Sequence, residues 1–238
     1  MTLEGITTPR NEVLSDANFD RLVQEFGYDS AFFLRQGGAI PDYSSVSVTE
    51  IDFNHLANDG TENLFIDLDL TIRRANEPDI DPEIVEHLDS ARRSGAIKGL
   101  WIVTDSEIDT SAFENQIGAN GTYSPIFNSH GKHKKTSPFY WEVLLRDLSD
   151  INPESVIMVG DRYLSDIKNP ARFTSLKTCK VDPLGDDYWF DKLPGRNIRN
   201  KDNISLLRAR FQWGIVLDAL EIERPEILKQ PEYNPKQI

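Results

Sequence analysis

Short apolar runs separated by segments with a helical pattern constrain the fold of this chain more than any other feature. Asn63–Leu68, Gly99–Thr104 and Ser155–Val159 have the length and character of buried strands. Asp81 followed by Pro82 is typical of a helix start, because Asp caps the first turn and proline fits the first helical position. Strands that alternate with helices predict a parallel sheet with helices on both faces, a Rossmann-like α/β fold.

The remaining expected elements continue this alternation. Helices are predicted over Val48–Leu56, Pro82–Arg93, Ser111–Ile117, Ser137–Leu148 and Tyr163–Phe173, and further strands over Tyr123–Phe127 and Leu176–Val181. We interpret Asn120-Gly121 as a turn before the first of these two strands. The regular pattern defines one α/β domain over residues 46–200, preceded by an N-terminal extension (1–45) with a short helix over Ala17–Phe26.

The C-terminal region, residues 201–238, is expected to hold a long helix and a tail. Apolar side chains fall on more than one side of a helix over residues 202–222: Leu207, Phe211, Trp213, Ile215, Leu217 and Leu220. Packing within the chain is the simpler interpretation, and a helix that joins two copies in a homodimer is the alternative.

The net charge limits the partners of the chain. Its 238 residues include 26 Lys and Arg against 39 Asp and Glu, a net charge of −13. Nucleic acids and anionic membranes bind cationic surfaces, so stable nucleic-acid binding is not expected. No apolar run is long enough for a transmembrane helix, residues 1–20 lack the pattern of a signal peptide, and the one cysteine, Cys179, cannot form an internal disulfide. We therefore expect a soluble cytoplasmic protein.

Acidic residues follow the first buried strand at the point where it ends. Asp67 and Asp69 come directly after the apolar run that closes with Ile66. Ligand sites of open parallel sheets lie at the carboxyl ends of the strands, so the two carboxylates are expected to converge there. Carboxylates held together repel each other unless a cation lies between them. A solvated acidic turn is the alternative interpretation of this segment alone.

A second acidic strand end favours a metal site. Asp161 and Asp166 follow the apolar run Ile157–Val159, and Gly160 lets the backbone approach a ligand closely. Two acidic strand ends in one parallel sheet suit Mg²⁺, which prefers carboxylate and water oxygens and commonly bridges to phosphate. A hydroxyl residue, Thr104, ends the intervening strand, and Lys135 stands where a helix opens.

These residues resemble the motifs of the haloacid dehalogenase (HAD) superfamily of aspartate-nucleophile phosphatases. The four motifs are matched by Asp67-Leu68-Asp69-Leu70-Thr71, Thr104, Lys135-Thr136-Ser137-Pro138 and Gly160–Asp166. The resemblance spans roughly residues 38–200. The capless subfamily IIIA, the YqeG-like and phosphatidylglycerophosphate phosphatase-like proteins, is indicated by Ile40–Tyr43, Ile51-Asp52, Val181–Leu184 and Arg196.

Three positions depart from the usual pattern of that branch. Asp105 follows Thr104 where Asn is usual, Leu70 stands where Gly or Asn is common, and Thr136 replaces a proline. None of these changes removes a charged catalytic group. Asp105 adds negative charge next to the expected phosphate site.

The resemblance implies a role for each site residue. Asp67 would be the nucleophile that forms an aspartyl-phosphate, and Asp69 the general acid and base. Thr104, Lys135 and Arg162 would bind the phosphate, with Ser106 and Lys134 as competing candidates for the hydroxyl and the lysine. Mg²⁺ would be the cofactor, and its implied ligands are Asp67, Asp69, Asp161 and Asp166.

The spacing of the motifs leaves no room for an inserted cap domain, because each segment between them is used by a helix and a strand. An open site suits a bulky phosphate, with phosphatidylglycerophosphate as the candidate that the resemblance offers. If the substrate is a lipid, we expect the basic stretch Lys132–Lys135 or Arg73-Arg74 to face it, with the protein peripheral to the membrane. A nucleotide or sugar phosphatase is the alternative within the superfamily.

Two alternatives belong to other functional classes. A receiver-type signalling domain also combines acidic residues, a hydroxyl and a lysine on an α/β sheet, but it places its phospho-acceptor on a later strand than the acidic pair. An inactive HAD-like scaffold is the other alternative, and retention of all four motifs argues against it.

Overall fold

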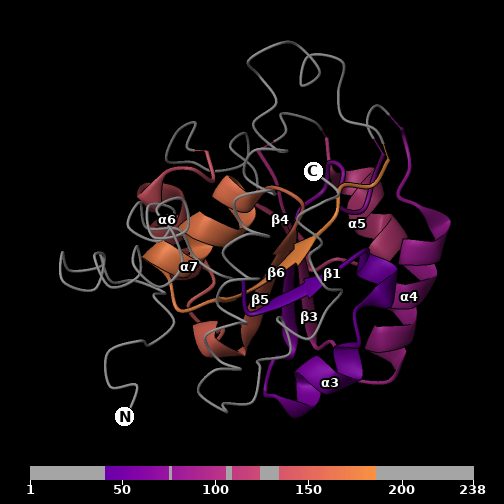
Figure 1. Cartoon of the computed structure of the whole chain (residues 1–238), viewed down its shortest axis with the longest axis horizontal. Helices are drawn as coiled ribbons and strands as arrows, with labels where there is room; N and C mark the ends of the chain where they lie inside the picture. The colour runs from indigo at the N-terminus through magenta and orange to yellow at the C-terminus, as the bar shows by residue number, and fades with distance from the viewer. Residues whose placement is uncertain (1–40, 75–76, 106–108, 124–133, 186–238) are drawn as a thin grey trace, which may run out of the picture.

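A six-stranded parallel sheet forms the centre of the computed structural model, which describes residues 41–74, 77–105, 109–123 and 134–185. The strands lie in the order β1-β6-β5-β2-β3-β4, and each neighbouring pair is parallel. Their bounds are β1 Tyr43–Ser45, β2 Asn63–Ile66, β3 Gly99–Val103, β4 Gly121–Tyr123, β5 Val156–Gly160 and β6 Lys177–Val181. Figure 1 shows the sheet between α6 and α7 on one side and α4 and α5 on the other. The predicted Rossmann-like α/β fold is confirmed.

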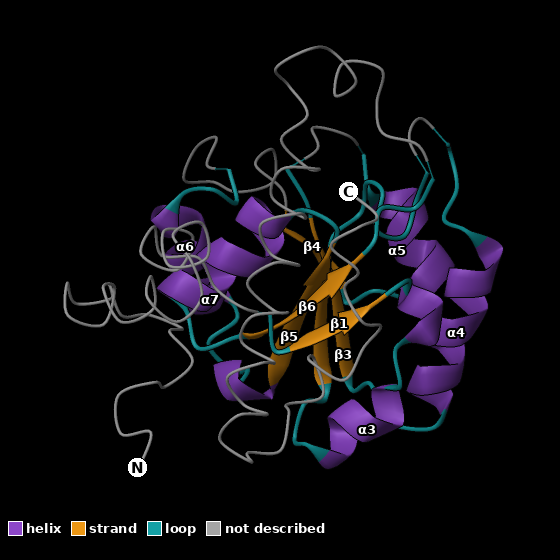
Figure 2. Ribbon diagram, in the orientation of Figure 1, coloured by secondary structure: helices purple, strands orange, loops and turns teal. Residues whose placement is uncertain are grey.

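Helices cover both faces of the sheet (Figure 2). One side holds α3 Phe53–Asn58, α4 Pro82–Arg93 and α5 Ser111–Ile117, and the other holds α6 Pro138–Asp147 and α7 Asn169–Phe173. Three shorter helical segments are the 3-10 helices η1 Val48–Glu50 and η2 Pro153–Ser155 and the π-helix η3 Tyr163–Lys168. Within the described residues, no further domain is inserted between the strands.

Side chains of β2 alternate between two hydrophobic cores. Leu64 and Ile66 face a larger core that includes Leu88 of α4, whereas Phe65 faces a smaller core that includes Trp141 of α6. Successive side chains of a strand point to opposite faces, so a strand covered on both sides must be apolar at every position. This explains the uninterrupted apolar runs in the sequence.

Helix α4 confirms the predicted start and end. The Asp81 side chain accepts a hydrogen bond from the Glu83 backbone N–H at 3.1 Å, and Pro82 occupies the first turn. Its buried face consists of Ile84, Leu88 and Ala91. Gly95, just beyond the helix, has a positive φ of 79° that glycine adopts without strain.

The single helix predicted over Val48–Leu56 is wrong, because the segment forms two separate elements. η1 ends at Glu50, and α3 begins at Phe53 and extends to Asn58. Asp52 separates them: its backbone is extended and its side chain accepts a hydrogen bond from the His55 N–H at 3.0 Å, which caps α3.

The predicted turn at Asn120-Gly121 also needs correction. Gly121 is the first residue of β4, so this strand begins two residues earlier than predicted. Asn120 fixes the start of the strand, since its N–H donates to the Leu100 carbonyl at 2.6 Å and its side-chain oxygen accepts from the Leu100 N–H at 2.9 Å. The rest of the predicted strand, residues 124–127, lies outside the described residues.

The boundary predicted at residue 46 is also too late, because β1 at Tyr43–Ser45 belongs to the sheet. β1 pairs with β6, with Tyr43 opposite Cys179. Asp42 secures the same edge by accepting a hydrogen bond from the Thr178 N–H at 2.8 Å.

The helix predicted over Tyr163–Phe173 is present, but its first part is the π-helix η3 and only Asn169–Phe173 is α-helical. π-helical turns often lie at functional sites.

The predicted helices over Ala17–Phe26 and residues 202–222 lie outside the described residues, as does the homodimer interface proposed for the second of them. Among the described residues, no helix combines the length and the apolar character that crossing a bilayer would require.

Candidate active site

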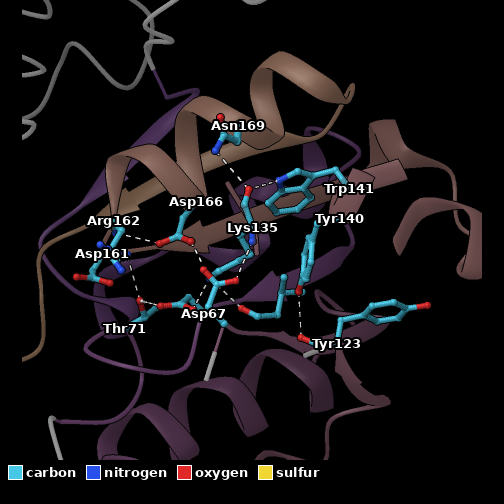
Figure 3. A network of polar contacts seen from close by, with 12 residues as sticks. Asp67, Thr71, Tyr123, Lys135, Tyr140, Trp141, Asp161, Arg162, Asp166 and Asn169 are labelled. Atoms are coloured by element: carbon cyan, nitrogen blue, oxygen red, sulfur yellow. Dashed lines mark hydrogen bonds and ion pairs between the residues drawn. The ribbon is translucent and has the colours of Figure 1, made fainter. Parts of the chain in front are cut away.

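Asp67 occupies the carboxyl end of the central strand β2. Its N–H donates to the carbonyl of Val159 at 2.9 Å, so the residue still follows the pairing with β5. The side chain is buried, with 5% of the residue exposed. A carboxylate in this position is held rigidly by the sheet at the edge where the predicted site residues meet (Figure 3).

Asp161 and Asp166 come from the end of β5 and from η3. Both are buried, and the Asp166 carboxylate accepts a hydrogen bond from the Arg162 N–H at 2.9 Å. Gly160 makes this arrangement possible: a Cβ added there would lie 2.4 Å from the Cβ, Cγ and Oδ2 atoms of Asp166. The glycine of this motif therefore makes room for the side chain of Asp166, besides any ligand.

The three carboxylates form one cluster. One oxygen each from Asp67, Asp161 and Asp166 lies within 4.8 Å of the other two, and all three residues are buried. Oxygen is the ligand type that Mg²⁺ prefers, and two oxygens of one Mg²⁺ shell lie at most about 4.2 Å apart. The donor set therefore fits a magnesium ion after small movements of the side chains.

Lys135 places its ammonium group inside this cluster. Nζ donates to Asp67 Oδ1 at 2.5 Å, to Asp166 Oδ1 at 2.7 Å and to the Val103 carbonyl at 3.1 Å. Only 2% of the residue is exposed. Lys134, the competing candidate, is exposed, so Lys135 is the lysine that the fold brings to the carboxylates.

Burial and charge act in opposite directions on these groups. Burial alone would lower the pKa of Lys135, but the nearby carboxylates, Asp166 and Asp67 above all, raise it well above its ordinary value. Burial raises the pKa of the Asp67 carboxyl, and Lys135 opposes this increase. The ammonium is thus the group that favours the ionised form of Asp67.

Thr71 is a site residue for which the sequence analysis assigned no role. Its hydroxyl donates to Asp67 Oδ2 at 3.4 Å and accepts from the Asp161 N–H at 3.0 Å. The hydroxyl therefore links the acidic ends of β2 and β5. The only signal for Thr71 in the sequence was its place in the first motif. Its contact with Asp161 could not be predicted, because it joins residues ninety positions apart in the chain.

Leu70 has a left-handed backbone with φ of 63°, a conformation that glycine and asparagine adopt more readily than leucine. The residue is fully buried, and its carbonyl accepts from the Leu184 N–H at 2.6 Å. Its N–H in turn donates to the Arg73 carbonyl at 2.7 Å. These contacts hold the strained turn that separates Asp67 from Thr71.

The structure does not bring the side chain of Asp69 into the carboxylate cluster. Asp69 forms an ion pair with Arg73, four residues further along the chain, and its side chain is 19% exposed. Arg73 also lies over the ring of Phe113, 5.0 Å from the ring centroid. Asp69 as a fourth metal ligand stays a prediction.

Thr104 and Arg162 lie beside the cluster. Thr104 is buried directly after β3, next to the carbonyl that binds Lys135, and its N–H donates to the Tyr123 carbonyl at 3.0 Å. Arg162 is exposed and contributes its backbone N–H to Asp166. Their contact with a phosphate stays a prediction, and Ser106, the alternative hydroxyl, lies outside the described residues.

A second buried lysine, Lys180, lies close to the site and was not singled out from the sequence. It occupies β6 opposite Gly160 of β5, and its Nζ donates to the Val181 carbonyl at 2.5 Å. Burial lowers the pKa of Lys180, and the neighbouring Asp161 carboxylate opposes this effect. Its place near the site follows from the pairing of β6 with β5, which the sequence of β6 alone does not indicate.

Comparisons with known proteins give no family for the chain. No family model and no curated protein matches it. Three chains of solved structures match, one of them an uncharacterized protein from Listeria monocytogenes serotype 4b. That match has 16% sequence identity and a TM-score of 0.40, and it covers 62% of this chain and 98% of the other.

Proposed function

We propose that the chain is a magnesium-dependent phosphomonoester hydrolase of the HAD type that acts through an aspartyl-phosphate on Asp67. The observation that carries the proposal is the buried group of Asp67, Asp161, Asp166 and Lys135 at the carboxyl ends of β2 and β5. Buried charges are costly unless opposite charges or a metal ion compensate them, and these four groups together leave a charge of −2.

A divalent cation would balance that charge. Asp67, Asp161 and Asp166 would hold Mg²⁺, whose chemistry is to withdraw charge from the phosphoryl oxygens and to neutralise the site for an anionic substrate. The residues themselves support this role, since their oxygens converge and are shielded from bulk water.

Asp67 would act as the nucleophile. A carboxylate oxygen of Asp67 forms a bond to phosphorus while the ester P–O bond breaks, and the leaving oxygen takes a proton from Asp69. In the second step water attacks the phosphorus and gives a proton to Asp69, and the bond between phosphorus and Asp67 breaks to release inorganic phosphate. Asp69 must leave its ion pair with Arg73 to serve in this way.

Lys135 and Thr104 would stabilise the charge that develops on the phosphoryl oxygens. The ammonium of Lys135 already contacts Asp67, so it lies beside the reacting atoms when the nucleophile attacks. Thr104 follows β3 at the same edge of the sheet and would donate its hydroxyl, and Arg162, exposed after β5, would contact the substrate from outside.

A bulky phosphate is the substrate class that we propose, with phosphatidylglycerophosphate as one candidate. The support is that the described connections of the sheet hold one or two helical segments each and no cap domain, together with the resemblance of the motifs to subfamily IIIA. A nucleotide or sugar phosphate is the alternative substrate.

Steady-state phosphate release from an aryl phosphate tests the proposal. We expect turnover with Mg²⁺, loss of turnover in excess chelator and recovery when Mg²⁺ is added back. Asp67→Asn should abolish turnover and retain the fold, because asparagine keeps an oxygen that can accept the hydrogen bond from Lys135.

Asp150→Asn, the same substitution at an exposed carboxylate, is the matched control and should leave turnover unchanged. Normal turnover by Asp67→Asn would refute the assignment of the nucleophile. Stoichiometric phosphorylation without turnover would instead indicate a phospho-accepting signalling domain, and no reaction at all would indicate an inactive scaffold.

A further inference from the structure

The backbone of Lys135 is held by three side chains from separate parts of the fold. Its N–H donates to Asp105 Oδ1 at 2.7 Å, just beyond the end of β3. Its carbonyl accepts from Trp141 Nε1 of α6 at 2.8 Å and from Asn169 Nδ2 of α7 at 3.3 Å (Figure 3). The backbone N–H and the backbone carbonyl of Lys135 are therefore both fixed by side chains.

This anchoring matters because the ammonium group has little freedom of its own. Nζ is hydrogen-bonded to two carboxylates and one carbonyl in a buried position. A shift of the Lys135 backbone would therefore move Nζ away from Asp67, or would require these three bonds to lengthen. Catalytic groups lose much of their effect when they are displaced by about 1 Å.

Asp105 is the anchor on the N–H side. It reaches across thirty positions of the chain from the end of β3 to the loop before α6. Asparagine could accept the same hydrogen bond, so the carboxylate adds negative charge beside Lys135 without being needed for the contact. This separates two effects of the residue, a hydrogen bond that fixes Lys135 and a charge near the carboxylate cluster.

We propose that Asp105 is a positioning residue that fixes the backbone of Lys135 through its N–H, while Trp141 and Asn169 fix the carbonyl. The catalytic part of this role rests on the proposed phosphatase function, but the positioning part concerns Lys135 itself. Trp141 is also packed in the smaller hydrophobic core, so its contact ties Lys135 to the buried side chains on that side of the sheet.

Amine labelling of the full chain, read by mass spectrometry, tests the positioning without requiring activity. Lys180 is the internal reference, because it is another buried lysine and lies on β6, away from the loop that holds Lys135. In Asp105→Ala we expect the ratio of labelling at Lys135 to that at Lys180 to rise about tenfold, the size expected when the Lys135 N–H loses its acceptor. In Asp105→Asn the ratio should stay within about twofold of the wild type.

An unchanged ratio in Asp105→Ala would overturn the proposal, and so would an equal rise in Asp105→Asn. A rise at both lysines together would show that Asp105 stabilises the whole fold, which also contradicts a local role. These outcomes are independent of whether the chain hydrolyses phosphate esters.

Kinetics with an aryl phosphate and Mg²⁺ test the catalytic part. Both substitutions remove the charge, so the difference between Asp105→Ala and Asp105→Asn isolates the hydrogen bond. We expect a KM about tenfold higher and a lower kcat in Asp105→Ala than in Asp105→Asn, since Lys135 would help to hold the phosphate. Equal KM and kcat in the two variants would refute the catalytic part of the proposal. Absence of turnover in the wild type would refute the proposed function and leave the labelling result to decide the positioning.

Discussion

Replacement of Gly160 by alanine should disrupt the carboxylate cluster from within the sheet. The new Cβ would lie 2.4 Å from Asp166, whereas ordinary van der Waals contact begins at 3.4 Å, so the Asp166 side chain must retreat by about 1 Å. It has little room to do so, because it is fully buried and its two oxygens accept from Lys135 Nζ at 2.7 Å and from the Arg162 N–H at 2.9 Å.

The expected loss of stability combines two effects. Overpacking of a tight interior costs about 1–3 kcal/mol, and a weakened hydrogen bond between charged groups costs about 1.5–3 kcal/mol. We therefore expect Gly160→Ala to lower the free energy of unfolding by about 3 kcal/mol, which corresponds to a Tm lower by roughly 6–12 °C for a chain of this length.

Thermal unfolding with and without Mg²⁺ is the assay. A ligand that binds the native state alone raises Tm, so the wild type should be stabilised by Mg²⁺ and Gly160→Ala should lose most of this increase. Gly95→Ala is the control: the positive φ of Gly95 makes alanine strained there, but a Cβ meets no atom within 4 Å, so this variant should lose stability and keep its full response to Mg²⁺. Wild-type stability of Gly160→Ala with a full response to Mg²⁺ would refute the reasoning.

Three further substitutions follow from single contacts. Thr71→Val leaves the Asp161 N–H without its hydroxyl acceptor and should lower the free energy of unfolding in urea by about 1–3 kcal/mol; a change below about 0.5 kcal/mol would contradict the bridging role. Leu70→Gly relieves a left-handed backbone worth about 1–2 kcal/mol but removes a fully buried side chain worth about 2–5 kcal/mol, so urea unfolding should show a net loss, and a gain would be inconsistent with this balance. Burial is the larger cause that raises the pKa of Tyr123 to about 12, and the hydrogen bond with Asp147 is the smaller one. The native state therefore keeps the phenol proton to a higher pH than the unfolded state, and stability should fall as pH rises from about 10 to about 12. Tyr123→Phe should weaken that decline in stability. The same dependence of stability on pH in the variant and the wild type would argue against a contribution from Tyr123.

Local signals allowed much of the fold to be predicted. α4 begins at Pro82 and ends at Arg93 as expected, because Asp81 and Gly95 act on the backbone of their own neighbourhood. β1 could not be found in this way: Tyr43–Ser45 is short and largely polar, and only its pairing with β6 makes it a strand. The separation of η1 from α3 was likewise missed, since Asp52 resembles any polar residue within an amphipathic helix.

The candidate site was predictable where strand ends carry the chemistry. Asp67 and Asp161 meet because parallel strands place their carboxyl ends at one edge of the sheet, and η3 and the loop before α6 bring Asp166 and Lys135 to the same edge. The partners of these residues were less accessible to sequence reasoning. The side chain of Asp69 pairs with Arg73, a local contact that competes with any role at the cluster.

The contacts of Lys135 explain how this fold can hold three buried carboxylates together. β2 supplies Asp67, η3 supplies Asp166 and β3 supplies the Val103 carbonyl, and each of these groups accepts a hydrogen bond from the same ammonium. Because those partners come from different elements, the ammonium can reach all of them only if the strands keep their register and η3 keeps its π-helical turn. The sheet therefore positions Lys135, and Lys135 offsets part of the repulsion among the carboxylates that the sheet brings together. Asp67, Asp161, Asp166 and Lys135 together keep a charge of −2 in a buried oxygen-lined site, and that remainder is the physical reason for expecting a divalent cation here.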